Sequence, residues 1–164
     1  MSNPAPDPHL STPALAAIAA TGIDVEVTRH GPVSSLEEAA QVRGIEPWQI
    51  LKTLVVRRTE GEFVFVLVPG DRQISWPKLR EHLGQSRLSM PDKDVAREVT
   101  GYERGTITPF GSATAWPVIA DALMVSREGP VSIGAGAHGV AASVDPTQLV
   151  EALGATVADV TDAL

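Results

Sequence analysis

The chain has 164 residues, of which 43% are hydrophobic and 20% are charged, a balance typical of one globular domain with its own core. It contains no cysteine, which excludes disulfides, thiolate catalysis and cysteine-ligated zinc. The four histidines are scattered without an H-E-x-x-H pair, so we expect no metal site.

The net charge is −7, but basic residues concentrate in the middle of the chain. Between Lys52 and Arg104 there are ten Lys and Arg against eight Asp and Glu, whereas the remainder has three against twelve. A mildly basic segment on an acidic body favours contact with a few phosphates and argues against coating a DNA duplex. Ordinary solvated surface charge is the alternative interpretation.

We predict a disordered tail over residues 1–10, followed by a single domain over 11–164. Met1 to His9 holds three prolines and no basic residue, unlike a secretory signal. No apolar run is long enough to cross a bilayer, so we expect no membrane partner and residence in the cytoplasm.

In chain order, the first elements are predicted from capping residues and hydrophobic spacing. They are a helix from Pro13 closed by Gly22, a strand over 23–28, a helix that a Ser34–Glu37 capping box opens and that runs through Arg43 to Gly44, and strands over 51–58 and 63–68 joined by a hairpin turn at 59–62. Pro69, Gly70 and Asp71 predict a further turn.

The second half predicts shorter elements separated by glycine and proline. They are helices over 75–84 and 91–100, a loop over 105–117, strands over 123–125, 131–133 and 140–144, a helix from Asp145–Pro146 to Gly154, and a final strand over 156–160. Because the order lacks a strict strand–helix alternation, we predict an α+β fold with a mixed, curved, barrel-like sheet and helices packed around it.

Gly134, Gly136 and Gly139 match the dinucleotide-binding fingerprint G-x-G-x-x-G. That fingerprint needs a helix directly after it, whose N-terminus holds the pyrophosphate. Residues 140–146 instead indicate an extended segment ending in a proline turn. We therefore expect no nucleotide cofactor, and favour a turn that brings its backbone close to a ligand.

Two segments could carry chemistry. Lys52 begins an apolar strand, where a lysine is either an edge residue extended to solvent or a cation at the mouth of a pocket. The segment from Gly105 to Gly111 could present several N–H groups to an anion or developing oxyanion, or could be a structural turn. A lone histidine such as His30 or His138 is more often structural, and no G-x-S-x-G motif supports a serine esterase.

Taken in order, these segments resemble the YbaK / prolyl-tRNA-editing (aminoacyl-tRNA deacylase) family. The matching stretches are His30 to Ala40, Ile50 to Val56, Val68 to Asp71, Leu83–Gly84, Gly105 to Gly111, Gly134 to Gly139 and Asp145 to Leu149. The resemblance implies an α+β fold and a trans-editing hydrolase that cleaves the ester of a mischarged tRNA. It also implies no cofactor, no metal and no protein nucleophile, with an aminoacyl-tRNA synthetase as a further partner.

Carried over by position, the resemblance assigns two sets of site residues. The catalytic set is Lys52, Gly105, Thr106 and Pro109, and the substrate-binding set is His30, Ser35, Thr108, Phe110, Gly111, Gly136, His138 and Ala141. Relatives that clear cysteine carry aspartate at the position of Ala141, and some carry tyrosine at that of Ser35. These departures favour alanine, serine, threonine or another small amino acid as substrate, and leave a non-catalytic module that binds a tRNA end or a nucleotide as the alternative.

Overall fold

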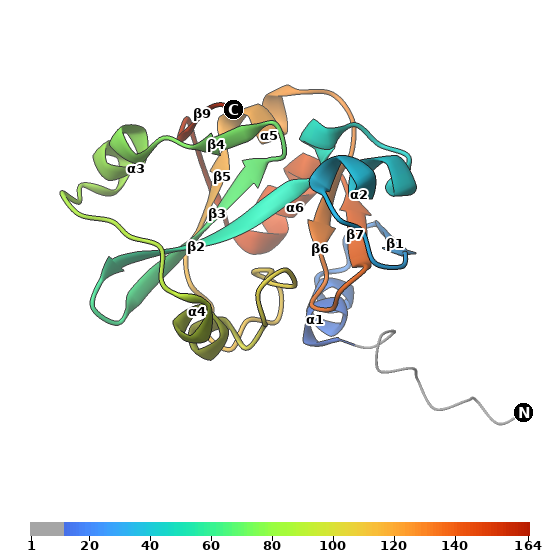
Figure 1. Cartoon of the computed structure of the whole chain (residues 1–164), viewed down its shortest axis with the longest axis horizontal. Coiled ribbons are helices and arrows are strands. Elements are labelled where there is room, and N and C mark those ends of the chain that lie inside the picture. Colours follow the sequence, from blue (N-terminus) through green and yellow to red (C-terminus); the bar gives the residue numbers. More distant parts are fainter. Residues whose placement is uncertain (1–11) are drawn as a thin grey trace, which may run out of the picture.

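The computed structural model describes residues 12–164 and has an α+β fold with three separate sheets (Figure 1). The predicted tail over 1–10 lies outside the described residues. The helices are α1 (Pro13–Thr21), α2 (Leu36–Arg43), α3 (Trp76–Leu83), α4 (Lys93–Thr100), α5 (Ala122–Ser126) and α6 (Pro146–Leu153), with a 3₁₀ turn η1 (Pro47–Gln49). The predicted α+β class is confirmed, and in the described part of the chain no sheet closes into a barrel.

Nine strands within residues 12–164 make up the sheets. They are β1 (Val25–Arg29), β2 (Leu51–Thr59), β3 (Glu62–Pro69), β4 (Arg72–Ile74), β5 (Val118–Asp121), β6 (Val131–Gly134), β7 (Val140–Val144), β8 (Thr156–Ala158) and β9 (Thr161–Ala163). The four-stranded sheet has the order β2-β3-β5-β8, in which β2 and β3 are antiparallel and the other pairs are parallel. An antiparallel sheet, β1-β7-β6, and the pair β4-β9 complete the fold.

Strand β3 is buried on both faces, which explains its continuous apolar run. Phe65 and Leu67 pack into one core together with Leu149 of α6. Val66, on the opposite face, packs into a second core together with Leu79 of α3. The four-stranded sheet is therefore covered on both faces, so a ligand can meet it at its ends or at its edge strands β2 and β8.

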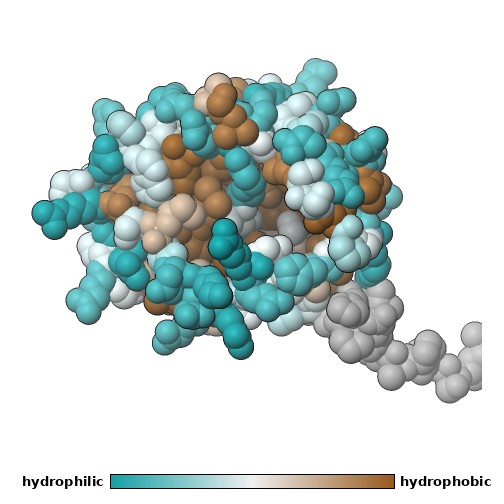
Figure 2. All heavy atoms as spheres, viewed as in Figure 1, coloured by the Kyte–Doolittle hydropathy of each residue, from teal (hydrophilic) through white to brown (hydrophobic). Residues whose placement is uncertain are grey.

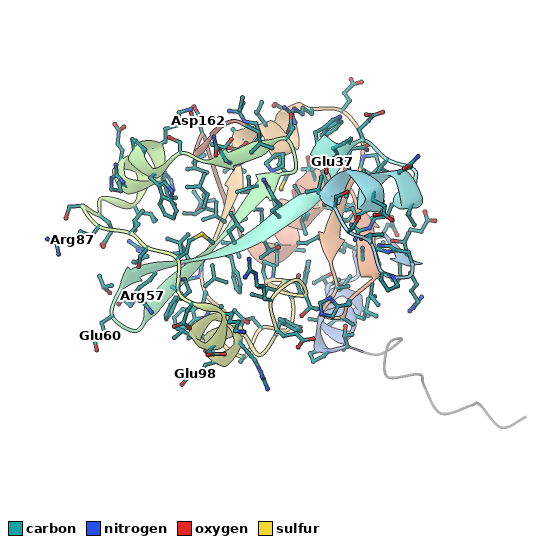
Figure 3. The ribbon with its side chains drawn as sticks, in the orientation of Figure 1. Glu37, Arg57, Glu60, Arg87, Glu98 and Asp162 are labelled. Carbon is teal, nitrogen blue, oxygen red and sulfur yellow. The ribbon has the colours of Figure 1, made fainter. Side chains whose placement is uncertain are left out.

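Strand β2 is the edge strand of this sheet and crosses the front of the molecule (Figure 1). Near its end Arg57, labelled in Figure 3, exchanges two main-chain hydrogen bonds with Ser89, of 2.7 and 3.3 Å. Main-chain groups of alternate residues point to the same side of an antiparallel strand, so those of Thr53 and Val55 also point to this edge. Strand β3 pairs Thr53 with Leu67 and Val55 with Phe65 on the inner side, but at the outer edge no bridge or main-chain hydrogen bond involves either residue within residues 12–164.

Two element predictions are wrong in detail. The cap of α2 is Ser35, whose hydroxyl accepts from the Glu38 N–H at 3.0 Å, and not Ser34 with Glu37. The error has a simple cause, since Ser-Ser-x-Glu-Glu fits the capping pattern in two registers. The predicted strand over 123–125 is helix α5, and the strand lies just before it as β5.

Other boundaries differ less. The helix predicted over 91–100 begins at Lys93, because the Asp92 carboxylate caps it. The strand predicted over 156–160 is β8, which ends at Ala158, and β4, β9 and η1 were not predicted. The extended segment after Gly139 is strand β7, which confirms that no helix follows the glycine-rich turn.

Candidate functional site

A cleft of about 720 Å³ lies beside β2. Segments far apart in the sequence line it: Arg43 at the end of α2, residues 50–55, residues 90–93 before α4 and at its start, and Gly105 with Ile107 from the following loop. Figure 2 shows this side of the molecule, where hydrophobic residues are visible between hydrophilic ones. The cleft therefore has an apolar base and a polar rim, as ligand sites usually do.

The charged residues lining the cleft are mostly cations. Arg43, Lys52, Lys93 and Arg104 line it, and Asp92 is the one acidic residue among its described lining. This excess contrasts with the net charge of −7 of the whole chain. A cleft that collects positive charge on an acidic protein favours an anionic ligand.

Lys52 and Gly105 line the same cleft. The Lys52 ammonium is half-buried and donates a hydrogen bond to the carbonyl of Arg72, the first residue of β4 after the turn that follows β3. Burial lowers the pKa of Lys52, and the nearby Asp71 carboxylate partly opposes that change. The cation is thus tethered at the cleft wall by a main-chain oxygen.

The turn that holds Lys52 is itself fixed from outside. Arg127 forms a bidentate ion pair with Asp71, with distances of 2.8 and 2.9 Å, and its guanidinium lies 5.3 Å from the centroid of the Trp48 ring. The hydrogen bonds from Arg127 hold the pKa of Asp71 below its ordinary value. Gly70 packs against η1 so closely that a Cβ there would lie 2.2 Å from the Pro47 carbonyl oxygen.

The opposite wall of the cleft is the loop after α4. Gly105 has φ of +90°, and a Cβ on it would lie 3.2 Å from the His138 ring. That ring in turn lies 3.1 Å from the Glu103 carboxylate, in an exposed pair. Thr106 is buried, donates its hydroxyl to the Glu103 carbonyl, and with Gly136 lines a smaller cavity of about 340 Å³. The two cavities share no lining residue.

Several predicted site residues lie in the interior of this loop. Thr108, Pro109 and Phe110 are buried and do not line the cleft. The Tyr102 hydroxyl donates to the Phe110 carbonyl at 2.7 Å. Gly111, with φ of +67°, approaches Pro13 so closely that a Cβ would lie 2.5 Å from its carbonyl oxygen. These contacts give the loop its shape.

Apart from Lys52, the predicted residues outside the loop do not reach the cleft lining either. Ser35 is the exposed cap of α2, and Ala141 is fully buried in β7, paired with Thr28 and Gly134. His30 does not line the cleft but contacts a residue that does: its Nε2 accepts a hydrogen bond from Arg43 Nε at 3.1 Å. Of the predicted set, the structure brings only Lys52 and Gly105 to the cleft.

Sequence reasoning did not single out two residues that line the cleft. Arg43 entered only as the end of a helix, and Thr53 only as part of a strand. The Thr53 hydroxyl is buried and has no hydrogen-bond partner within residues 12–164. A buried hydroxyl without a partner is uncommon in proteins, and its position in the cleft wall suits a ligand contact.

Two other kinds of site find no support in the described chain. No group of three or more His, Asp or Glu side chains there lies close enough together to hold a metal ion. None of the helices over residues 12–164 is long and apolar enough to cross a membrane.

Residues 30–152 match the model of the aminoacyl-tRNA editing domain. A proline–tRNA ligase of Citrifermentans bemidjiense is 38% identical over 104 residues, which make up 63% of this chain and 18% of the ligase. A proline–tRNA ligase of Desulforamulus reducens is 39% identical over 86 residues, or 52% of this chain and 15% of the ligase. The chain therefore matches less than a fifth of either ligase.

Solved structures share the whole fold. A protein proposed to be a trans-editing enzyme for prolyl-tRNA synthetase superposes with a TM-score of 0.83 at 27% identity, covering 94% of this chain and 99% of that one. The hypothetical protein APE2540 superposes with a TM-score of 0.84 at 28% identity, covering 92% and 100%.

Proposed function

The chain belongs to the aminoacyl-tRNA editing domain family, and on that premise we propose that it hydrolyses the ester of a mischarged aminoacyl-tRNA in trans. The amino acid removed is small, and the tRNA is that for proline or a related one. The ligase relatives support this choice of tRNA, and the likeness to a proposed trans-editing enzyme supports action in trans. The setting is the cytoplasm, with an aminoacyl-tRNA synthetase as a further partner.

The observation that carries the proposal is the cationic cleft beside the unpaired edge of β2. Its four cations suit the phosphates of a tRNA end. The main-chain groups of Thr53 and Val55 point to the same edge and offer donors and acceptors to an ester or a ribose. Because these cations are confined to one cleft, they suit a few phosphates and not the length of a DNA duplex.

The described side chains of the cleft bear on the chemistry of the proposed reaction. Thr53 carries the one hydroxyl among the described residues lining it, and no histidine lines it. The family resemblance implies water or a group of the substrate as the nucleophile in the proposed reaction, and the lack of a histidine beside the Thr53 hydroxyl is consistent with it. The protein contributes positioning and stabilisation of the developing oxyanion by fixed N–H groups, an effect worth about 3 kcal/mol for one well-placed donor.

Within this proposal Lys52 and Gly105 contact the substrate directly. Lys52 supplies a cation near the terminal nucleotides, and Gly105 lets the main chain approach the aminoacyl group. Thr106, Thr108, Pro109, Phe110 and Gly111 act by holding the shape of the loop. For His138 and Gly136 we propose support of that loop from the neighbouring turn, consistent with the contact between His138 and Gly105.

The test is a deacylation assay on tRNA for proline charged with alanine, serine, threonine or cysteine. We expect the wild type to hydrolyse at least one of these, and Lys52→Ala to lose at least tenfold in rate. Lys78→Ala is the matched control, because Lys78 pairs with Asp159 and Asp162 away from the cleft. Thermal unfolding of each variant separates a catalytic loss from a folding defect, and an unchanged rate in folded Lys52→Ala removes the role given to Lys52.

The alternative is a module that binds a tRNA end or a nucleotide without turnover. The cleft itself keeps this alternative open, since Asp92 is the one carboxylate among its described lining residues and already caps α4. Binding of uncharged tRNA with no hydrolysis of any mischarged substrate would favour it over the deacylase.

A further inference from the structure

Arg43 ends helix α2, and its guanidinium is held in a fixed plane. Its Nε donates to His30 Nε2 at 3.1 Å, and its Nη1 donates to the Ser132 hydroxyl of β6 at 3.0 Å. His30 Nδ1 lies 2.8 Å from the Gly31 carbonyl, which fits a proton on Nδ1 and leaves Nε2 free to accept. Both partners of Arg43 are therefore neutral acceptors.

This cation has no acidic partner among the described residues. Arg127 and Lys78 both pair with aspartates, but no ion pair involves Arg43. The side chain is half-buried, and burial lowers the pKa of Arg43. A partly desolvated guanidinium without a counter-charge is costly, and the chain has 20 acidic residues that could have supplied one.

The usual role of a basic residue in the last turn of a helix does not account for the hydrogen bonds of Arg43. Such residues interact with the last helical carbonyls and the negative end of the helix dipole. The hydrogen bonds of Arg43 run instead to the segment before α2 and to β6. Its guanidinium is directed across the wall of the cleft, which Arg43 lines together with Lys52.

The free donors of Arg43 define the ligand. A guanidinium has five N–H donors, and the two hydrogen bonds leave three of them, including both on Nη2. Held in one plane, they match the paired oxygens of a phosphate. The esterified amino acid offers only a cationic amino group and a neutral carbonyl, so the phosphodiester backbone is the better fit.

We propose that Arg43 binds a phosphodiester group of the 3′-terminal nucleotides of the tRNA, with His30 as a positioning residue that orients the guanidinium. This inference rests on the proposed function for the identity of the RNA. In this proposal His30 orients Arg43 and does not contact the substrate itself.

The experiment measures binding of an RNA hairpin that carries no amino acid and ends in unpaired CCA. It also measures binding of the same hairpin without these three nucleotides. We expect Arg43→Gln to weaken binding of the CCA hairpin about tenfold or more and to leave the truncated hairpin unaffected. The salt dependence of log affinity should also lose about 0.7 in slope, the value for one single-strand phosphate contact. Arg43→Lys, which keeps the charge without the planar fork, should recover part of the loss.

Arg29→Gln is the matched control, because it removes the same charge from an exposed position on β1. It should leave both affinities unchanged. Thermal unfolding checks that each variant folds. Unchanged binding by folded Arg43→Gln, or an equal loss on the truncated hairpin, would overturn the assignment.

The role of His30 has its own readout. His30→Ala removes the acceptor for Arg43 Nε, whereas His30→Gln can keep one. We expect a loss of CCA-hairpin binding in the first variant and its partial rescue in the second, and equal losses would contradict a positioning role. The RNA in this experiment carries no amino acid, so binding is measured independently of hydrolysis. A wild-type protein that binds the hairpin through Arg43 but hydrolyses no mischarged tRNA would contradict the deacylase proposal and leave the role of Arg43 supported.

Discussion

The two walls of the cleft are built on different principles. On one side β2 is a regular strand, and its register with β3 sets the direction of every main-chain group. On the other side residues 101–117 form no helix or strand, and close packing fixes their path. Gly111 lies against Pro13, and Gly136 lies against Tyr102, so three distant segments interlock there.

The difference indicates where each wall tolerates change. A strand keeps its main-chain directions when a side chain is replaced, since the hydrogen bonds of the sheet persist. An irregular loop keeps its path only while its individual contacts remain. Substitutions in the loop should therefore cost stability, and substitutions on β2 should chiefly affect the ligand.

The largest effect is expected at Gly111. Gly111→Ala combines a left-handed φ with a Cβ 2.5 Å from the Pro13 carbonyl oxygen and should lower the free energy of unfolding by about 3 kcal/mol, measured by urea denaturation. Gly84→Ala is the control, because Gly84 has φ of +64° with open space around it and should cost only about 1 kcal/mol. Equal costs would mean that the packing against Pro13 does not hold the loop.

A middle effect is expected at Tyr102. Tyr102→Phe leaves the buried Phe110 carbonyl without its partner and should cost about 1–2 kcal/mol. Burial also raises the pKa of Tyr102 to about 12, above its ordinary 10. Between these pH values the unfolded chain releases a proton that the folded chain keeps, so wild-type stability should fall as pH rises through 10. Tyr102→Phe should lack this component, and an identical pH profile would contradict it.

The smallest effect on stability is expected on the strand wall. Thr53→Val removes a hydroxyl that has no partner among residues 12–164 and adds a residue that favours strands. The free energy of unfolding should change by less than about 0.5 kcal/mol. Deacylation should fall about threefold to tenfold, the value of one hydrogen bond to substrate. A large loss of stability would erase the contrast between the two walls.

The sequence predicts best what local interactions decide. The β-branched runs of β2 and β3 and the glycines that end five helices, at Gly22, Gly44, Gly84, Gly101 and Gly154, were predicted correctly because their signals lie within a few residues. The segment from β5 to α5 was predicted incorrectly. Asp121 caps α5 and also accepts from the Val160 N–H, 39 residues away, and no local pattern reveals such a contact.

The candidate site divides in the same way. Lys52 and the segment beginning at Gly105 stood out from their own residue patterns, the family resemblance assigned them roles, and both line the cleft. Arg43 was missed because its orientation depends on Ser132, 89 residues along the chain, and on a particular tautomer of His30. When uncharged residues far away in the sequence orient a side chain, neither motif spacing nor composition indicates that orientation.

The lining of the cleft runs from Arg43 to Gly134, and the Thr12 hydroxyl bonds to the Ala135 carbonyl at 2.6 Å across 123 positions. Such long-range closures are among the last events of folding, because the entropy of a large loop must first be overcome. A partly unfolded chain would accordingly lack the binding cleft, and its helices, of nine residues or fewer, would be marginal without tertiary packing. Turnover in a refolding experiment should appear only with the final native population.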